Sequence, residues 1–359
     1  MTIFLLGPYP PPYGGVSVHV KRLYERLKNY TSIKIHTTSK NKYFLTKKIK
    51  DIIVFSFFLK KEEIYHIHES SIKLILILSF INFIRKNKMI LTIHNDRFEN
   101  NCNKENFIIR YLLKNFLKNI NHIILVGDNE IEFFYKNNIK KNNISIIPGY
   151  INPIINKEDY LKIDKEVWEF IESSKSKNEK IITGNGNIRF FNNEDLYGLD
   201  LLIEIIHLLK KDGYKVSLLF ALLGYDNQTQ EERNYFEELE NRIKKYQIDK
   251  EVFIYKVKDT EYYPILDKTD IFIRPTNTDG YGISVTEAIY LKKPAIASDV
   301  CQRQKGTIYF KSRDTKDLFE KTKFVLDNYD EEKNKLGKIE VKEYYEEVLE
   351  VYKKVYRGK

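Results

Sequence analysis

The sequence predicts an α/β protein made of two similar domains with parallel sheets. The chain has 359 residues, about twice the length of an ordinary single domain. Short apolar runs rich in β-branched residues alternate with stretches of helical periodicity, which is typical of strand-helix-strand units. The runs form two series, separated by a stretch that begins with proline and glycine and ends in a polar, lysine-rich segment. We therefore expect two Rossmann-like domains.

Each series contains six apolar runs of strand length. The expected strands of the first domain are residues 2–6, 32–36, 64–68, 89–93, 122–126 and 144–148. Those of the second domain are residues 180–184, 215–224, 252–255, 270–276, 294–298 and 307–310.

The domain boundaries follow from the same pattern. Residues 148–180 begin with proline and glycine and end in a polar, lysine-rich stretch, so we expect the connector between the domains there. The predicted domains are 1–160 and 161–340, followed by a charged helical segment at 341–359.

The composition argues against several classes of protein. Two cysteines, Cys102 and Cys301, are too few for a disulfide framework and lack the paired spacing of a metal site. The longest apolar run, 74–84, has 11 residues and is too short to span a bilayer. Residues 1–15 have no basic region before their apolar run, which favours a first strand over a signal peptide. We expect a cytoplasmic protein.

The positive charge of the chain is unevenly distributed. The formal net charge is +10, but residues 1–150 carry +13 and residues 151–359 carry −3. A basic face that meets an anionic membrane or an anionic substrate is one interpretation. A general excess of lysine on a solvated surface is the other. No nucleic-acid-binding signature accompanies the charge, so we expect no nucleic acid partner.

The stretch TDGYGISVTEAI, residues 278–289, follows a predicted strand and runs into a predicted helix. Its glycines permit a turn and the close approach of a ligand. The amides of Gly282, Ile283 and Ser284 would then lie at a helix start, where unsatisfied N–H groups and the helix dipole favour a phosphate.

Two carboxylates flank this turn. Glu287 could accept two hydrogen bonds from a vicinal diol such as a ribose, and Asp279 could bind the hydroxyls of another sugar. The alternative is an ordinary glycine turn followed by an acidic helix start.

A second glycine loop follows the first predicted strand. Gly14 and Gly15 immediately precede an amphipathic run, so backbone amides again meet a helix start at the end of a strand. A proline-glycine turn without a ligand is the alternative.

Several motifs occur in a fixed order over nearly the whole chain: PPYGGVSVHVKRL, IYHIHES, LTIHND, IIPGYI, YGLDLLIEI and TDGYGISVTEAIYLKKPAIASD. In this order and spacing the chain resembles the retaining GT-B glycosyltransferases, the large nucleotide-sugar-dependent family called glycosyl transferases group 1, of the family 4 type. The resemblance implies a GT-B fold, with two Rossmann-like domains facing across a cleft. It also implies that the segment 341–359 returns to the first domain.

The resemblance assigns roles to residues of the two glycine loops. Gly14 and Gly15 would contact the donor diphosphate or the reacting sugar. The amides from Gly282 to Ser284 would hold the donor's sugar and phosphates. Glu287 would bind the ribose diol.

Two residues would be catalytic by the same resemblance. Asp279 stands where the family more often has a glutamate and would bind a donor-sugar hydroxyl, and His94 matches a histidine close to the reacting sugar. His66 and His68 remain structural or acceptor-side candidates. We expect no metal site there, because no third ligand lies at a credible spacing.

One departure from the family pattern concerns the cations that pair with the diphosphate. The family commonly has an arginine and, shortly after it, a lysine; here Arg189 could keep the first role, but Tyr197 stands in the place of the lysine. Arg274 and Arg303 are candidate replacements, although either could be purely structural.

The expected reaction is transfer of a sugar, with retention of configuration, from a nucleotide-sugar donor to a hydroxyl acceptor. No DxD motif is present, so we expect no metal or other cofactor. A glycan or lipid-linked acceptor at the inner face of the cell membrane, used in polysaccharide biosynthesis, fits the basic first domain. A nucleotide-sugar epimerase and a non-catalytic nucleotide-sugar-binding protein are the alternatives.

Overall fold

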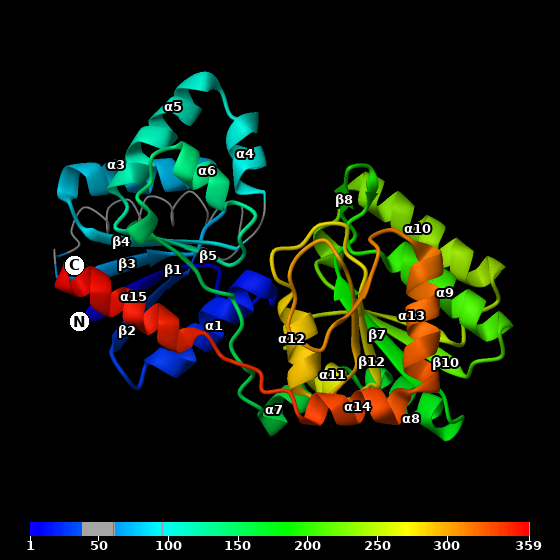
Figure 1. Cartoon of the computed structure of the whole chain (residues 1–359). Helices are drawn as coiled ribbons and strands as arrows, with labels where there is room; N and C mark the ends of the chain where they lie inside the picture. The colour runs from blue at the N-terminus through cyan, green and yellow to red at the C-terminus, as the bar shows by residue number, and fades with distance from the viewer. Residues whose placement is uncertain (38–59, 61, 95–96, 359) are drawn as a thin grey trace. The chain divides into compact units, whose positions relative to one another are not determined.

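The computed structural model describes residues 1–37, 60, 62–94 and 97–358 (Figure 1). The chain forms two compact units: Met1–Ile151 together with Lys342–Lys359, and Asn152–Val341. Each unit contains a six-stranded parallel sheet with helices packed on it. No helix in the described part of the chain is long and apolar enough to cross a membrane.

The sheet of the first unit has the order β2-β1-β3-β4-β5-β6. Its strands are β1 (Thr2–Gly7), β2 (Ser32–Thr37), β3 (Ile64–Ile67), β4 (Lys88–Ile93), β5 (His122–Leu125) and β6 (Ile144–Ile146). All neighbouring strands pair in parallel. The strand order reverses between β1 and β3, and ligands of open α/β sheets bind outside the carboxyl ends of the strands at such a point.

Helices cover both faces of this sheet. They are α1 (Gly15–Leu27), α3 (Ile72–Arg85), α4 (Phe98–Lys104), α5 (Phe107–Phe116), α6 (Ile131–Lys136) and α15 (Tyr345–Arg357). One core cluster joins α3, α4, α5 and α6 to the sheet, and another joins α1 and α15 to it. The helix α15 buries Val348, Val351, Tyr352 and Val355, a helical spacing that places one apolar stripe on the first unit.

The sheet of the second unit has the order β11-β10-β7-β12-β13-β14. Its strands are β7 (Lys180–Gly186), β10 (Val216–Leu222), β11 (Val252–Lys256), β12 (Ile271–Arg274), β13 (Ala295–Ser298) and β14 (Ile308–Phe310). The neighbouring strands again pair in parallel. The order reverses between β7 and β12, which places the carboxyl ends of these two strands side by side.

The helices of the second unit are α7 (Lys157–Leu161), α8 (Lys165–Ser176), α9 (Leu199–Lys211), α10 (Gln230–Lys245), α11 (Tyr263–Lys268), α12 (Ile283–Tyr290), α13 (Thr315–Asp327) and α14 (Tyr329–Gly337). The largest core cluster packs α9, α10 and α13 against the sheet. All twelve predicted strands are confirmed, with ends that differ by at most two residues.

Two features of the second unit differ from the expectation. Most of the predicted connector is folded, because α8 buries Val167 and Ile171 in a core cluster with the sheet. The sequence between β7 and α9 forms a short antiparallel hairpin, β8 (Phe190–Phe191) and β9 (Glu194–Asp195). Its turn contains Asn192 and Asn193, both with positive φ, and asparagine is one of the few residues that tolerate this conformation.

Candidate functional site

The predicted loop of the second unit connects the carboxyl end of β12 to the start of α12. Gly282 precedes α12 with φ +75°, in the left-handed region that favours glycine. A Cβ atom at Gly282 would also overlap the guanidinium of Arg303. The glycine is therefore needed for both the backbone conformation and the space that an arginine occupies.

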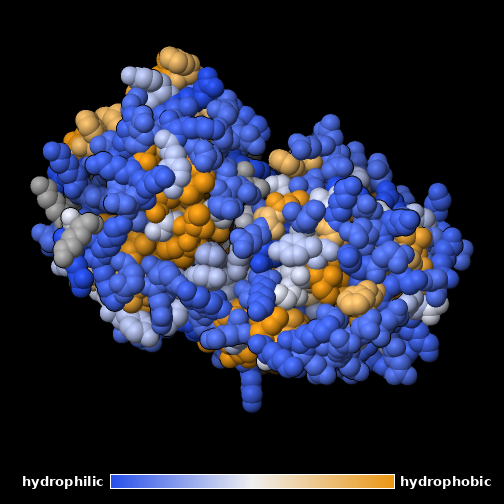
Figure 2. All heavy atoms as spheres, viewed as in Figure 1, coloured by the Kyte–Doolittle hydropathy of each residue, from blue (hydrophilic) through white to orange (hydrophobic). Residues whose placement is uncertain are grey.

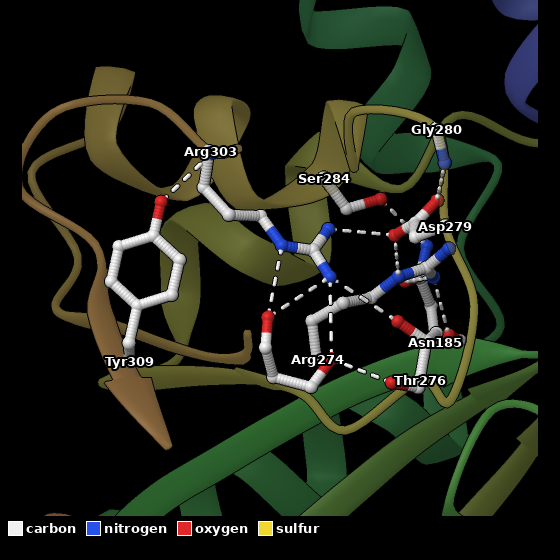
Figure 3. Close-up of polar contacts among 9 residues, drawn as sticks. Asn185, Arg274, Thr276, Asp279, Gly280, Ser284, Arg303 and Tyr309 are labelled. Atoms are coloured by element: carbon white, nitrogen blue, oxygen red, sulfur yellow. Dashed lines mark hydrogen bonds and ion pairs between the residues drawn. The ribbon is translucent and has the colours of Figure 1, made fainter. Parts of the chain in front are cut away.

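Asp279 lies between two arginines that come from different parts of the unit (Figure 3). Its Oδ2 atom is 3.1 Å from Nε of Arg274, at the end of β12, and 2.7 Å from Nη1 of Arg303. Its Oδ1 atom accepts a hydrogen bond from the amide of Gly280 at 3.1 Å. The sequence suggested each of these charged residues separately, and the structure brings them together.

The two arginines determine the charge state of this aspartate. Burial alone would raise the pKa of Asp279, but the nearby positive charges of Arg274 and Arg303 lower it far below the usual value. The carboxylate is therefore ionised, and the three side chains together carry one net positive charge. Because both carboxylate oxygens already accept hydrogen bonds, Asp279 has less capacity for a sugar hydroxyl than the resemblance implied.

Arg303 is held entirely by the protein. Its side chain is 0% exposed. Besides Asp279, its nitrogens lie near the Thr276 hydroxyl and near the carbonyl and hydroxyl oxygens of Ser298, at 3.3 to 3.5 Å. Tyr309 accepts a hydrogen bond from the Arg303 amide at 2.9 Å. These contacts make Arg303 a fixed counter-ion of Asp279.

Arg274 is connected to the start of α12 through Asn185. Its Nη1 atom donates to the carbonyl and the side-chain oxygen of Asn185, at 3.1 and 3.2 Å. Asn185 in turn donates to the hydroxyl of Ser284 at 3.1 Å. A chain of contacts thus links the ends of β7 and β12 to the first turn of α12, where helix geometry leaves amide groups without intrahelical acceptors. This arrangement suits an anionic ligand.

Tyr197, which by the resemblance takes the place of a lysine, packs against Arg274 and Gly186. The guanidinium of Arg274 lies 5.1 Å from the centre of the Tyr197 ring. The ring also covers Gly186, where a Cβ atom would overlap it. Gly198, with φ +69°, approaches Pro275 so closely that a Cβ would lie 2.5 Å from the Pro275 carbonyl oxygen.

The other predicted donor-side residues lie in two places. Glu287 is buried in α12, 4% exposed, and its charge adds to the burial that raises the pKa of Tyr262. Arg189 precedes the β8–β9 hairpin and pairs with Glu232 of α10 at 3.3 Å. The structure therefore places Arg189 in a different ion pair from the Asp279 cluster.

In the first unit, His68 and His94 follow β3 and β4 directly. Nδ1 of His68 and Nε2 of His94 are 2.8 Å apart. His19 of α1 lies against both rings, with centroid separations of 5.4 Å to His68 and 4.9 Å to His94, and donates from Nδ1 to the Gly149 carbonyl at 2.8 Å. His19 belongs to the PPYGGVSVHVKRL motif but was not among the predicted site residues.

His66 lies on β3, two residues before His68, and its contacts are those of a structural residue. Its two ring nitrogens bond to the Tyr352 hydroxyl and the Thr92 hydroxyl, both at 2.6 Å. Burial is the main cause that lowers the pKa of each of the four histidines, to about 4 for His19 and well below the usual value for His66, His68 and His94. All four imidazoles are therefore neutral near pH 7.

His68 and His94 line a pocket of about 180 Å³ together with Pro8, Val16, Glu69, Ser70, Ile93, Phe98 and Asn101. Gly14 and Gly15 start the neighbouring helix α1, and a Cβ atom at either would meet nothing within 4 Å. Since Gly14 is extended with φ −164°, the fold of the unit does not itself require glycine there. Asn95 and Asp96 of the LTIHND motif lie outside the described residues.

The histidine group has a geometry that could hold a metal ion. His19, His68 and His94 offer ligand atoms within 4.8 Å of one another, so these three side chains could hold a metal ion. Sequence spacing did not indicate this third candidate ligand, because the three histidines come from a helix and from the ends of two strands that are distant in sequence. The rings already hydrogen-bond within the protein, and a metal would replace the bond between His68 and His94.

Comparison with known proteins places these two sites in context. Residues 188–340 match the family model of glycosyl transferases group 1. A search of curated proteins finds no match to the chain. Among solved structures, sucrose-phosphate synthase from Thermosynechococcus elongatus superposes with a TM-score of 0.70 at 12% identity, covering 100% of both chains.

Two further structures share the fold. A glycosyltransferase from Rickettsia africae has a TM-score of 0.68 at 13% identity, covering 100% of this chain and 99% of that one. Anabaena HepE in complex with UDP-glucose has a TM-score of 0.64 at 10% identity, covering 92% and 91%. The chain thus has the GT-B fold, and residues 188–340, the group 1 segment, match the model of that family.

Proposed function

We propose that this GT-B protein is a retaining glycosyltransferase that moves a sugar from a nucleotide-sugar donor to a hydroxyl acceptor. The observation that carries the proposal is the cluster of Arg274, Asp279 and Arg303 beside the start of α12, within the group 1 segment. A net positive cluster next to a helix start suits the diphosphate of such a donor. HepE, which shares the fold, has been solved with UDP-glucose.

In this proposal the second unit binds the donor. The amides from Gly282 to Ser284 hold the sugar and phosphates, and Glu287 accepts hydrogen bonds from the ribose diol. The departing nucleotide carries developing negative charge, which preorganised arginines and helix amides stabilise without a metal ion. Asp279 keeps the two arginines in position and contacts the donor sugar only through what remains of its hydrogen-bonding capacity.

The first unit supplies the acceptor side of the reaction. His94 is neutral and lines the pocket, so one of its ring nitrogens can accept a hydrogen bond from a sugar hydroxyl. The glycine pair at the start of α1 leaves room for a ligand that a larger side chain would fill.

We further propose that the acceptor is a lipid-linked or cell-surface polysaccharide precursor at the inner face of the membrane. Support comes from the outer faces of α3 and α5, which pack on each other. Their exposed apolar side chains are Ile77, Phe80, Phe83, Ile84, Phe107, Ile108 and Tyr111. Figure 2 shows hydrophobic side chains at the surface where α5 lies in Figure 1. Residues 72–118 carry nine Lys and Arg against three Asp and Glu, which suits an anionic lipid surface.

The two alternatives differ from the proposal in what they do with a donor. An epimerase converts the nucleotide-sugar without any acceptor, and a binding protein leaves it unchanged. Thermal unfolding with UDP-, GDP-, ADP- and dTDP-sugars identifies the donor, because a ligand of the folded state raises the melting temperature. We expect one donor class to do so, and we expect transfer from it to a glycan acceptor with the anomeric configuration retained, as read by NMR.

The same assay tests the need for a metal. We expect transfer to be unchanged after treatment with EDTA. Loss of transfer that Zn²⁺ restores would instead assign a metal to His19, His68 and His94. A donor that is bound but neither transferred nor epimerised would support the binding protein.

A further inference from the structure

Arg274 has a hydrogen-bonding edge that the protein does not use. Its Nε atom donates to Asp279 and its Nη1 atom to Asn185. Within residues 1–37, 60, 62–94 and 97–358, its Nη2 atom has no hydrogen-bond partner, and 13% of its side-chain surface is exposed. A guanidinium fixed at two nitrogens presents the third in a defined direction.

Arg303 differs in both respects. All three of its guanidinium nitrogens have protein acceptors, and its side chain has no exposed surface. Of the two arginines that contact Asp279, Arg274 is therefore the one that can donate to a ligand. Arg303 acts through Asp279 and is a positioning residue.

The position of Arg274 favours an anionic ligand. It ends β12 where the strand order of the sheet reverses, next to Asn185 at the end of β7. Asn185 also contacts Ser284 in the first turn of α12. Figure 3 shows these three side chains grouped at the loop that carries Asp279. An anion placed there would meet a cation, an amide side chain and a helix start together.

Tyr197, which stands in place of the lysine that the resemblance implies, contacts Arg274 directly. Its ring lies under the guanidinium of Arg274, with 5.1 Å between the guanidinium carbon and the ring centre. An aromatic ring at this distance stabilises a cation through its negative face. The residue that replaces the lysine thus supports a neighbouring arginine.

We propose that Arg274 binds the diphosphate of the donor in place of the family's lysine, and that Tyr197 holds its guanidinium for that contact. This inference rests on the proposed function, because it assumes a nucleoside diphosphate donor. It assigns the contact to Arg274 and not to Arg189, which is paired with Glu232.

The test is titration calorimetry of the full chain with UDP, UMP and uridine, or with the corresponding GDP, ADP or dTDP series if thermal unfolding selects another base. Arg274→Gln should weaken the diphosphate roughly ten- to a hundredfold, the loss expected for a charge-assisted hydrogen bond. The same variant should bind the nucleoside like the parent. Arg233→Gln, an exposed arginine of α10, is the matched control and should change none of the affinities.

Further variants test whether Arg274 has taken over the role of a lysine at position 197. Tyr197→Lys combined with Arg274→Gln should recover part of the lost diphosphate affinity, because it returns a cation to the family's usual position. Tyr197→Phe should keep the parent's affinity, since the ring is retained. Thermal unfolding of each variant without ligand checks that it folds.

The outcomes separate the inference from the function. A parent chain that binds none of the diphosphates would overturn the proposed function. A parent that binds a diphosphate while the folded Arg274→Gln variant binds it equally well would overturn only the inference. Equal losses for the diphosphate and the nucleoside would also overturn it, because the role would then be structural. A loss confined to Arg189→Gln would reassign the contact to Arg189.

Discussion

Nη1 of Arg303 lies 2.7 Å from Oδ2 of Asp279, although 24 residues separate the two in the chain. The guanidinium is fully buried, so this carboxylate is the counter-charge that makes its burial possible. Asp279, which was expected to contact the sugar, therefore also stabilises the loop between β12 and α12.

Replacing Asp279 should destabilise the second unit. Asp279→Asn leaves two arginines without their shared counter-ion, and breaking a buried ion pair costs about 3–5 kcal/mol. We expect a loss of this size in urea unfolding at pH 7, with Asp226→Asn, an exposed aspartate, as the control. Because the pKa of Asp279 is lowered on folding, its contribution is present above the unfolded value near 3.8 and is lost as the pH falls through the folded value. Unchanged stability at pH 7 would contradict the role of the pair.

Glu287 should matter for the nucleotide itself. Glu287→Gln keeps the shape of the side chain but removes the charge, and we expect it to weaken the nucleoside diphosphate by about 1–3 kcal/mol. Titration calorimetry measures this directly. Glu240→Gln, on the exposed part of α10, provides the control, and equal affinities for both variants would remove Glu287 from the donor site.

His94 should matter for turnover and not for the donor. Since His94 lines a pocket of the first unit, His94→Ala should lower the transfer rate by roughly a hundredfold, as for a lost contact in the transition state. Affinity for the nucleoside diphosphate should stay at the parent's value. His36→Ala, on the edge strand β2, is the comparison. Lost nucleotide binding with a normal residual rate would refute the assignment.

The face formed by α3 and α5 should mediate membrane binding. Replacing Phe107, Ile108 and Tyr111 by serine should strongly reduce sedimentation with vesicles of phosphatidylcholine and phosphatidylglycerol, because these side chains are 60 to 72% exposed. Binding should weaken with salt, which screens charges over about 8 Å at physiological ionic strength. Leu161→Ser alters an 84% exposed side chain of the second unit and is the control. Equal binding to vesicles of phosphatidylcholine alone would argue against this surface.

A buried histidine should make the first unit sensitive to acid. His122 bonds to Ser145 at 2.9 Å, and burial, with the charge of Lys354, lowers its pKa to about 4. The unfolded chain binds a proton near pH 6.5 and the folded chain does not until about 4, so stability falls as the pH drops through this range. At about 1.4 kcal/mol per pH unit, His122 should lower the free energy of unfolding by about 2 kcal/mol between pH 6.5 and pH 5.

Urea unfolding at pH 7 and pH 5 checks this prediction. The variant His122→Gln should lose about 2 kcal/mol less than the parent between the two values. Ser145→Ala keeps the ionisable group and should retain the parent's pH dependence. Identical pH dependence of the parent and His122→Gln would show that this group does not titrate as the structure indicates.

The strands were predictable because alternating apolar runs and turns are a local property of the chain. The β8–β9 hairpin was missed, although the asparagine pair at its turn was a usable signal. The contacts of Asp279 were beyond sequence reasoning, because each arginine is brought to it by a different strand or loop of a sheet whose order reverses. The same holds for His19, whose partner Gly149 lies 130 residues away.

The pairing of Tyr352 with His66 has a consequence for how the protein is made. The core of the first unit includes residues from α15, whereas the second unit is contiguous from Asn152 to Val341. During translation the second unit can therefore complete its fold before the first, although domains usually mature from the N-terminus onward. Until α15 emerges from the ribosome, the apolar side chains that it covers stay uncovered on the nascent chain. The earlier half of the chain is thus the later one to bury its complete core.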